Sequence, residues 1–119
     1  MKALSKIAIV LAAILLPAIA HAHAFLDHAS PKVGGMVATA PRELLLWFTE
    51  KLEPAFSTVE VRNAQGAVVS GKAQAAGGDS TELRVPLKAL PPGTYSVSWR
   101  VLSVDTHRTQ GNFSFHVGP

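Results

Sequence analysis

Three residues far apart in the sequence carry groups that could bind one transition metal ion. His23 follows Ala20-His21-Ala22, while Asp105 and His107 lie two positions apart near the C-terminus. If processing makes His23 the first residue, its α-amine and imidazole form a two-nitrogen chelate. In an extended segment, side chains at i and i+2 project to the same side, so Asp105 and His107 could converge on one ion. Three nitrogens and one oxygen suit the tetragonal preference of Cu(II).

Residues 1–22 have the features of a cleaved secretory signal peptide. Lys2 and Lys6 provide a positive start, residues 7–20 are an apolar run, and Ala20-His21-Ala22 has the A-x-A pattern of a cleavage site. The run is shorter than the roughly 20 apolar residues that span a bilayer. We expect cleavage before His23.

Two other cleavage positions fit the same small-residue pattern. A cut after Ala18-Ile19-Ala20 would expose His21, and a cut after Ala22-His23-Ala24 would expose Phe25. Two of the three alternatives leave an N-terminal histidine.

The composition of the predicted mature chain limits its partners and its metal ligands. Residues 23–119 comprise 97 residues, enough for one small domain. Nine basic residues against eight acidic ones give a net charge of about +1, so nucleic acid is not an implied partner. The chain has no cysteine. A metal site must therefore use nitrogen and oxygen donors, which suit Cu(II), Ni(II) or Zn(II) more than Cu(I).

Short strands separated by glycine and proline turns predict an all-β fold. The expected strands are residues 24–30, 44–48, 58–62, 67–70, 81–85, 95–101 and 113–117. Asn63-Ala64-Gln65-Gly66 is turn chemistry that predicts a hairpin, and residues 71–80 predict a surface loop. With no convincing helix after residue 22, the pattern predicts a single-domain antiparallel β-sandwich of Greek-key topology, Ig-like or cupredoxin-like.

The other aromatic and histidine side chains have ordinary structural interpretations. Residues 44–48 are continuously apolar, which predicts a strand buried on both faces. Trp47 and Trp99 are expected in the core. His28 is expected at the surface, and His116 should face away from its apolar neighbours on the last strand.

Several segments together resemble the CopC family of periplasmic copper-binding proteins. They are His23-Ala24-Phe25-Leu26, Ser30-Pro31-x-x-Gly34, Leu46-Trp47-Phe48-Thr49-Glu50, Pro92-Gly93-Thr94-Tyr95-Ser96-Val97-Ser98-Trp99-Arg100, Ser103-Val104-Asp105-Thr106-His107 and Gly111-Asn112-Phe113-Ser114-Phe115. Each segment is unspecific alone, but the combination spans nearly the whole predicted mature chain.

The resemblance implies a β-sandwich that binds one Cu(II) per chain through His23, Asp105 and His107. It also implies a periplasmic, monomeric carrier in copper resistance, homeostasis or uptake, with an inner-membrane CopD-like partner. Some family members hold Cu(I) in a methionine-rich loop, but residues 71–78 contain no methionine.

Two further positions follow from the resemblance. Thr106 occupies a position where many relatives have glycine, so a positive φ there would strain the loop. Glu50 resembles a recurrent family glutamate that could orient a ligand, and an ordinary strand-end charge is the alternative.

Two other classes of function are compatible with parts of the sequence. An N-terminal histidine with a second histidine also resembles the histidine brace of copper mono-oxygenases, although Asp105 would fill a position that oxygen activation needs open. The strand pattern alone would permit a metal-free Ig-like interaction domain. No catalytic triad or phosphate-binding glycine loop can be assembled, so we expect a binding protein and not an enzyme.

Overall fold

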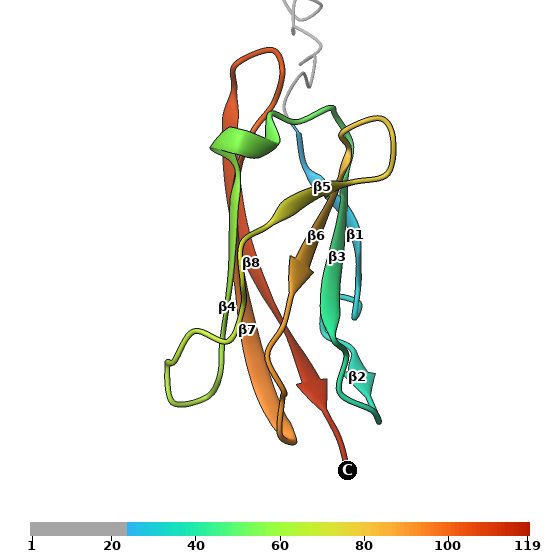
Figure 1. Ribbon diagram of the computed structural model, residues 1–119, viewed down its shortest axis with the longest axis vertical. Helices are drawn as coiled ribbons and strands as arrows, with labels where there is room; N and C mark the ends of the chain where they lie inside the picture. The colour runs from blue at the N-terminus through green and yellow to red at the C-terminus, as the bar shows by residue number, and fades with distance from the viewer. Residues whose placement is uncertain (1–23) are drawn as a thin grey trace, which may run out of the picture.

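The computed structural model describes residues 24–119, which form two four-stranded sheets packed face to face (Figure 1). Sheet A has the strand order β1-β3-β6-β5, and sheet B has the order β2-β8-β7-β4. The strands are β1 Leu26–Ser30, β2 Met36–Val37, β3 Glu43–Phe48, β4 Thr58–Arg62, β5 Gln74–Ala76, β6 Glu82–Pro86, β7 Gly93–Leu102 and β8 Arg108–Val117. A short 3₁₀ turn, η2, covers Pro54–Phe56. The predicted single-domain β-sandwich is confirmed.

The long strands β7 and β8 form the centre of sheet B. They pair in antiparallel register from Gly93 opposite Val117 to Leu102 opposite Arg108. Every second residue of β7 from Tyr95 to Val101 is buried, as its two-residue period predicts. Trp99 packs edge-on against Phe48 of sheet A, with ring centroids 5.2 Å apart, so this pair joins the two layers of the core.

Strand β3 is buried on one face only, so the prediction of burial on both faces was wrong. Leu44, Leu46 and Phe48 point into the core, whereas Leu45 and Trp47 are half-buried on the outer face of sheet A. The sequence could not distinguish these faces, because Leu45 and Trp47 on the outer face are apolar, so the strand lacks the alternation of apolar and polar residues that marks a one-sided strand. Trp47 is therefore not a core residue.

Four segments differ from the sequence-based expectation. Residues 71–80 contain strand β5, the edge strand that pairs with β6. Strand β2 pairs in parallel with β8, the one parallel pairing among the described strands. Strand β8 begins at Arg108, five residues before the predicted start, because pairing with β7 holds polar residues in the ladder. Residues 67–70 contribute isolated bridges to Arg62 and Leu87 rather than a full strand.

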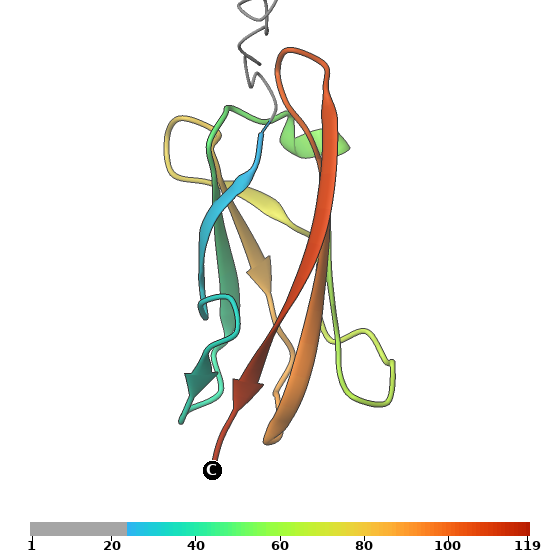
Figure 2. The same cartoon turned by 180° about the vertical axis from the view of Figure 1, so that it is seen from behind.

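The two ends of the sandwich differ in what they bring together. One end, which we call the loop end, contains the start of the described chain at Ala24, residues 49–57, the β5–β6 turn and the β7–β8 turn (Figures 1 and 2). The C-terminus and the turn after β4 lie at the opposite end (Figure 1). Within residues 24–119, no helix has the length and apolar character to cross a membrane.

Candidate metal centre

The β7–β8 turn brings Asp105 and His107 together. The turn is closed by two backbone hydrogen bonds, from Ser103 N to the His107 carbonyl oxygen at 3.0 Å and from Thr106 N to the Ser103 carbonyl oxygen at 2.9 Å. His107 Nδ1 lies 3.3 Å from Asp105 Oδ1. The two side chains therefore converge as predicted, although they do so on a tight turn and not on an extended strand.

Both side chains are accessible and carry the donor atoms that a divalent transition metal requires. The His107 side chain is 51% exposed and the Asp105 side chain 38% exposed. An imidazole nitrogen and a carboxylate oxygen suit Cu(II) or Zn(II). The pair therefore fits the nitrogen and oxygen donor set that the sequence predicted.

Ser103 holds the Asp105 carboxylate in its ionised form. Ser103 is buried, with 1% of its surface exposed, and its hydroxyl donates a hydrogen bond to Asp105 Oδ1. This hydrogen bond, and to a lesser extent the neighbouring His107, hold the pKa of Asp105 below its ordinary value of 3.8. Asp105 is thus a ready anionic ligand at neutral pH. In the sequence, Ser103 was only the first residue of the Ser103-Val104-Asp105-Thr106-His107 segment, and its contact with Asp105 was not predicted.

Thr106, between the two candidate ligands, has a left-handed backbone with φ of +70°. The condition under which the sequence implied strain, a positive φ at this position, is therefore met. A β-branched residue rarely adopts this conformation, which costs of order 1–3 kcal/mol. The surrounding turn therefore maintains a strained residue beside both candidate ligands.

The first described residues are anchored next to this turn. Ala24 is fully buried, and its carbonyl oxygen accepts a hydrogen bond from Thr109 Oγ1, two residues after His107. Phe25 is held on the other side by two hydrogen bonds with Thr49. Phe25 N donates to Thr49 Oγ1 at 3.0 Å, and Thr49 N donates to the Phe25 carbonyl oxygen at 2.9 Å. The described chain thus starts between the two sheets, beside the β7–β8 turn.

His23, the third predicted ligand, lies outside the described residues, as does the predicted signal peptide. Among residues 24–119, no group of three or more histidine, cysteine, aspartate and glutamate side chains could hold a metal ion. A metal site built on Asp105 and His107, which we call the candidate half-site, would therefore need further donors.

Glu50 lies in the loop that borders the candidate half-site. This loop is hydrogen-bonded to the β7–β8 turn, because Val104 N donates to the Lys51 carbonyl oxygen at 3.0 Å. Glu50 is exposed and follows Thr49, the partner of Phe25. Its backbone is thus between the start of the chain and the turn, which is compatible with either role that the sequence suggested.

His28 is an exposed histidine with two close contacts. Its Nδ1 lies 2.7 Å from Asp27 Oδ2, and its ring stacks on Trp47 with centroids 4.3 Å apart and planes 6° apart. The predicted surface location is confirmed, and Trp47 forms a stacking contact instead of filling the core. His116 faces away from Phe115 and Val117, as expected, and its Nδ1 is 3.1 Å from Thr94 Oγ1.

Residues 26–118 match the CopC domain family. Protein YobA of Escherichia coli K12 is 38% identical over 98 residues, which are 81% of this chain and 79% of that protein. Copper resistance protein C of Xanthomonas campestris pv. juglandis is 34% identical over 123 residues, which are 98% of this chain and 96% of that protein. The crystal structure of CopC from Methylosinus trichosporium OB3b superposes with a TM-score of 0.77 at 35% identity, covering 82% of this chain and 95% of that one.

Proposed function

We propose that this chain, which belongs to the CopC family of copper-binding proteins, is a periplasmic carrier that binds one Cu(II) ion in copper resistance or homeostasis. The observation that carries the proposal is the pairing of Asp105 with His107 beside the buried start of the described chain at Ala24. The ligands are the α-amine and imidazole of His23, the carboxylate of Asp105 and the imidazole of His107.

The anchoring of Ala24 supports His23 as the missing part of the site. Consecutive Cα atoms are about 3.8 Å apart, so the residue before Ala24 is within reach of the β7–β8 turn that Thr109 holds against it. Cleavage of residues 1–22 as a signal peptide would leave the amine of His23 free to coordinate. Before its removal, this signal peptide would direct the protein to the periplasm.

The donor set favours Cu(II) over Cu(I). Cu(I) prefers soft sulfur ligands, and Met36 is the only methionine after residue 22. Met36 is 69% exposed on β2, whereas the Asp105–His107 pair lies at the loop end. Any sulfur ligation would therefore have to come from outside this site.

The proposed role is that of a carrier and not of an oxygenase. Asp105 occupies coordination space beside His107 that an oxygen-activating centre would need open. The receiving partner in this proposal is a CopD-like protein of the inner membrane, and the carrier acts as a monomer.

Copper affinity measured by competition with a calibrated chelator tests the ligand set. His107→Ala, Asp105→Ala and a chain with one extra residue before His23 should each bind Cu(II) more weakly than the mature chain, because each removes one donor. His116→Ala is the matched histidine control and should bind normally. Affinity should also fall as the pH drops, because protons compete with the metal ion for the amine and imidazole nitrogens. Equal affinity of the extended and native N-termini would exclude His23 as the anchor.

A further inference from the structure

Two exposed arginines lie close together on the outer face of sheet B, near the loop end. Arg100 on β7 is opposite Gln110 on β8, and Arg108 lies two residues before Gln110 on the same face. Neither arginine forms an ion pair with a residue of the described chain, whereas Arg62 on β4 is 2.8 Å from Glu60. The two positive charges are therefore available to an external anion.

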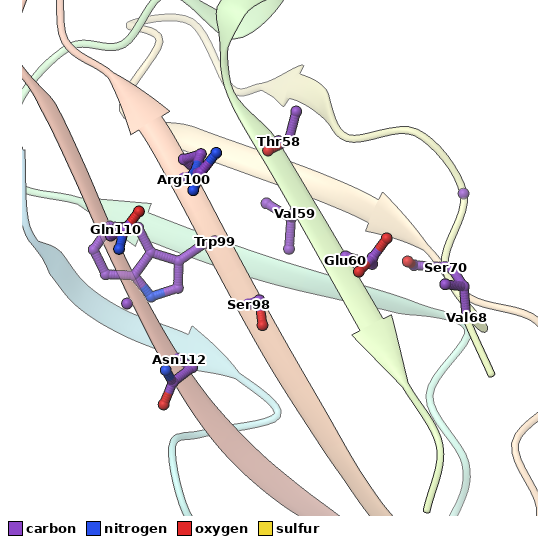
Figure 3. A pocket seen from close by; sticks show the side chains of 12 residues that line it. Thr58, Val59, Glu60, Val68, Ser70, Ser98, Trp99, Arg100, Gln110 and Asn112 are labelled. Atoms are coloured by element: carbon purple, nitrogen blue, oxygen red, sulfur yellow. The ribbon is translucent and has the colours of Figure 1, made fainter. Parts of the chain in front are cut away.

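A hollow of about 360 Å³ lies between these arginines, lined by Arg100, Arg108, Thr109 and Gln110. It is large enough for a small organic ligand, since ligand pockets begin at roughly 300 Å³. Figure 3 shows the neighbouring pocket, which shares Arg100 and Gln110 with this hollow, and there Arg100 lies between Thr58 of β4 and Gln110 of β8. Guanidinium groups bind carboxylates through paired hydrogen bonds, so the lining suits a carboxylate ligand.

The hollow adjoins the proposed copper site. Arg108 directly follows His107, and Thr109 donates its hydroxyl hydrogen to the carbonyl oxygen of Ala24. Besides Lys51, the loop end presents carboxylates, including Asp105 and Glu50, which attract cations and repel anions. Two unpaired arginines beside such a site would be unfavourable for a bare metal cation.

We propose that Arg100 and Arg108 bind the carboxylates of an anionic copper chelate, so that Cu(II) is delivered to the site as a small-carboxylate complex. This inference rests on the proposed function and adds the chemical form of the cargo. The arginines hold the chelate beside the site while His107, Asp105 and His23 replace the carboxylates around the ion. No bond of the ligand breaks, and the freed carboxylate leaves the hollow or remains on the arginines.

Stopped-flow loading of the mature protein from three copper sources tests this proposal. The sources are anionic Cu(II)–citrate, neutral bis(glycinato)Cu(II) and cationic bis(ethylenediamine)Cu(II). Quenching of tryptophan fluorescence monitors the loading of copper. In Arg100→Gln/Arg108→Gln, loading from citrate should slow about tenfold at low salt, since electrostatic steering changes association rates by 10-fold or more. Loading from the glycinate complex should be unchanged, and loading from the cationic complex should be faster.

Two control variants separate charge from structure. Arg100→Lys/Arg108→Lys keeps both charges and should recover most of the citrate rate, and Lys88→Gln removes one charge at the opposite end and should have no effect. The equilibrium copper affinity should not fall in any of these variants, because none of them removes a proposed ligand. Equal slowing from all three sources, or an unchanged citrate rate in the double glutamine variant, would overturn the proposal. If the unmodified mature protein takes up no copper from any source, the proposed function fails instead.

Discussion

Two turns at opposite ends of the sandwich share one backbone pattern but carry different residues. In the turn after β4, Asn63 N donates to the Ala67 carbonyl oxygen at 2.9 Å, and Gly66 N donates to the Asn63 carbonyl oxygen at 2.9 Å. The β7–β8 turn has the same two bonds between the corresponding residues, Ser103 to His107 and Thr106 to Ser103. The fourth residue has a positive φ in both, +86° at Gly66 and +70° at Thr106. The two turns lie at opposite ends of the molecule (Figure 1).

The differences lie at the positions that could do chemistry. The turn after β4 has glutamine, glycine and alanine at its third, fourth and fifth positions, where the β7–β8 turn has Asp105, Thr106 and His107. Asn63 Oδ1 accepts hydrogen bonds from Gln65 N and Ala67 N, so its side chain stabilises the turn itself. Ser103 instead donates its hydroxyl hydrogen to Asp105. One turn is built for local stability, and the other brings Asp105 and His107 together at the expense of strain.

The largest predicted effect comes from exchanging the ligand positions of the two turns. Asp105→Gln/His107→Ala gives the β7–β8 turn the residues of the other turn and should lower Cu(II) affinity by more than 100-fold. Loss of a residue that only hydrogen-bonds to a metal ligand lowers metal affinity about 10–100-fold, and this change removes two proposed ligands. Competition with a calibrated chelator measures it.

The reverse exchange is the matched control. Gln65→Asp/Ala67→His should place an Asp–His pair on the same backbone but create no tight copper site, because the proposed amine and imidazole of His23 are at the loop end. Tight binding of a second ion by this variant would show that the turn alone is sufficient and that the start of the chain is not required.

The second prediction concerns where copper stabilises the fold. The core is formed by apolar strands, so the apoprotein should unfold cooperatively without metal. A ligand at 100 times its Kd adds about 2.7 kcal/mol through binding to the folded state, which corresponds to a rise in Tm of roughly 10 °C or more for a domain of this size. Hydrogen exchange should slow at residues 103–107 and not at residues 63–67. Uniform slowing in both turns would contradict a local site.

The third prediction uses the fourth position of each turn. Thr106→Gly should stabilise the apoprotein by about 1 kcal/mol, because relief of about 1–3 kcal/mol of backbone strain exceeds the 0.4–1 kcal/mol entropic cost of glycine. Gly66→Thr should destabilise it by about 1–2 kcal/mol, since no atom lies within 4 Å of an added Cβ and only the backbone conformation opposes the change. Denaturant unfolding measures both.

Thr106→Asn separates the relief of backbone strain from the entropic cost of glycine in that experiment. Asparagine tolerates the left-handed region without the flexibility of glycine, so it should stabilise the turn as well. A destabilised Thr106→Asn variant would mean that the hydrogen bond from Thr106 Oγ1 to the Asp105 carbonyl oxygen outweighs the backbone strain.

The sequence predicted the parts of the structure that depend on local patterns. The alternating β7 and the Asn63–Gly66 turn follow from side-chain period and turn chemistry, and both are present. The spacing of Asp105 and His107 correctly predicted their proximity. It could not predict that Ser103 orients Asp105, because that contact depends on the closed turn. The anchoring of Ala24 by Thr109 joins residues 85 positions apart, and only the assembled sandwich brings them together.

The faces of the strands were less predictable than their positions. Residues 44–48 contain no polar residue to mark the outer face, and the stacking of His28 on Trp47 depends on the register between β1 and β3. Strand β5 is short and glycine-flanked, so its sequence has no strand signal of its own, and it is stabilised by pairing with β6. Long-range pairing determines these features.

The smallest predicted effect is a pH dependence of the apoprotein that belongs to the β7–β8 turn. The Ser103 hydrogen bond lowers the pKa of Asp105 in the folded protein below its ordinary value of 3.8. A carboxylate of this kind contributes stability above its unfolded pKa and loses that contribution as the pH falls through the folded pKa. The midpoint of denaturant unfolding should therefore decline below about pH 4, and Ser103→Ala should flatten that part of the decline.

Asp79 provides the comparison needed to assign this effect. Its pKa is lowered by hydrogen bonds from the side chain and backbone of Thr81 in the β5–β6 turn. Thr81→Val should remove the side-chain part of that contribution and leave the Asp105 part, so the Ser103→Ala/Thr81→Val double variant should show the weakest acid dependence. The turn after β4 has no carboxylate, and Asn63→Ala should lower stability by a similar amount at every pH. A pH-dependent loss in Asn63→Ala, or an unchanged acid limb in Ser103→Ala, would contradict the assignment of different roles to the two turns.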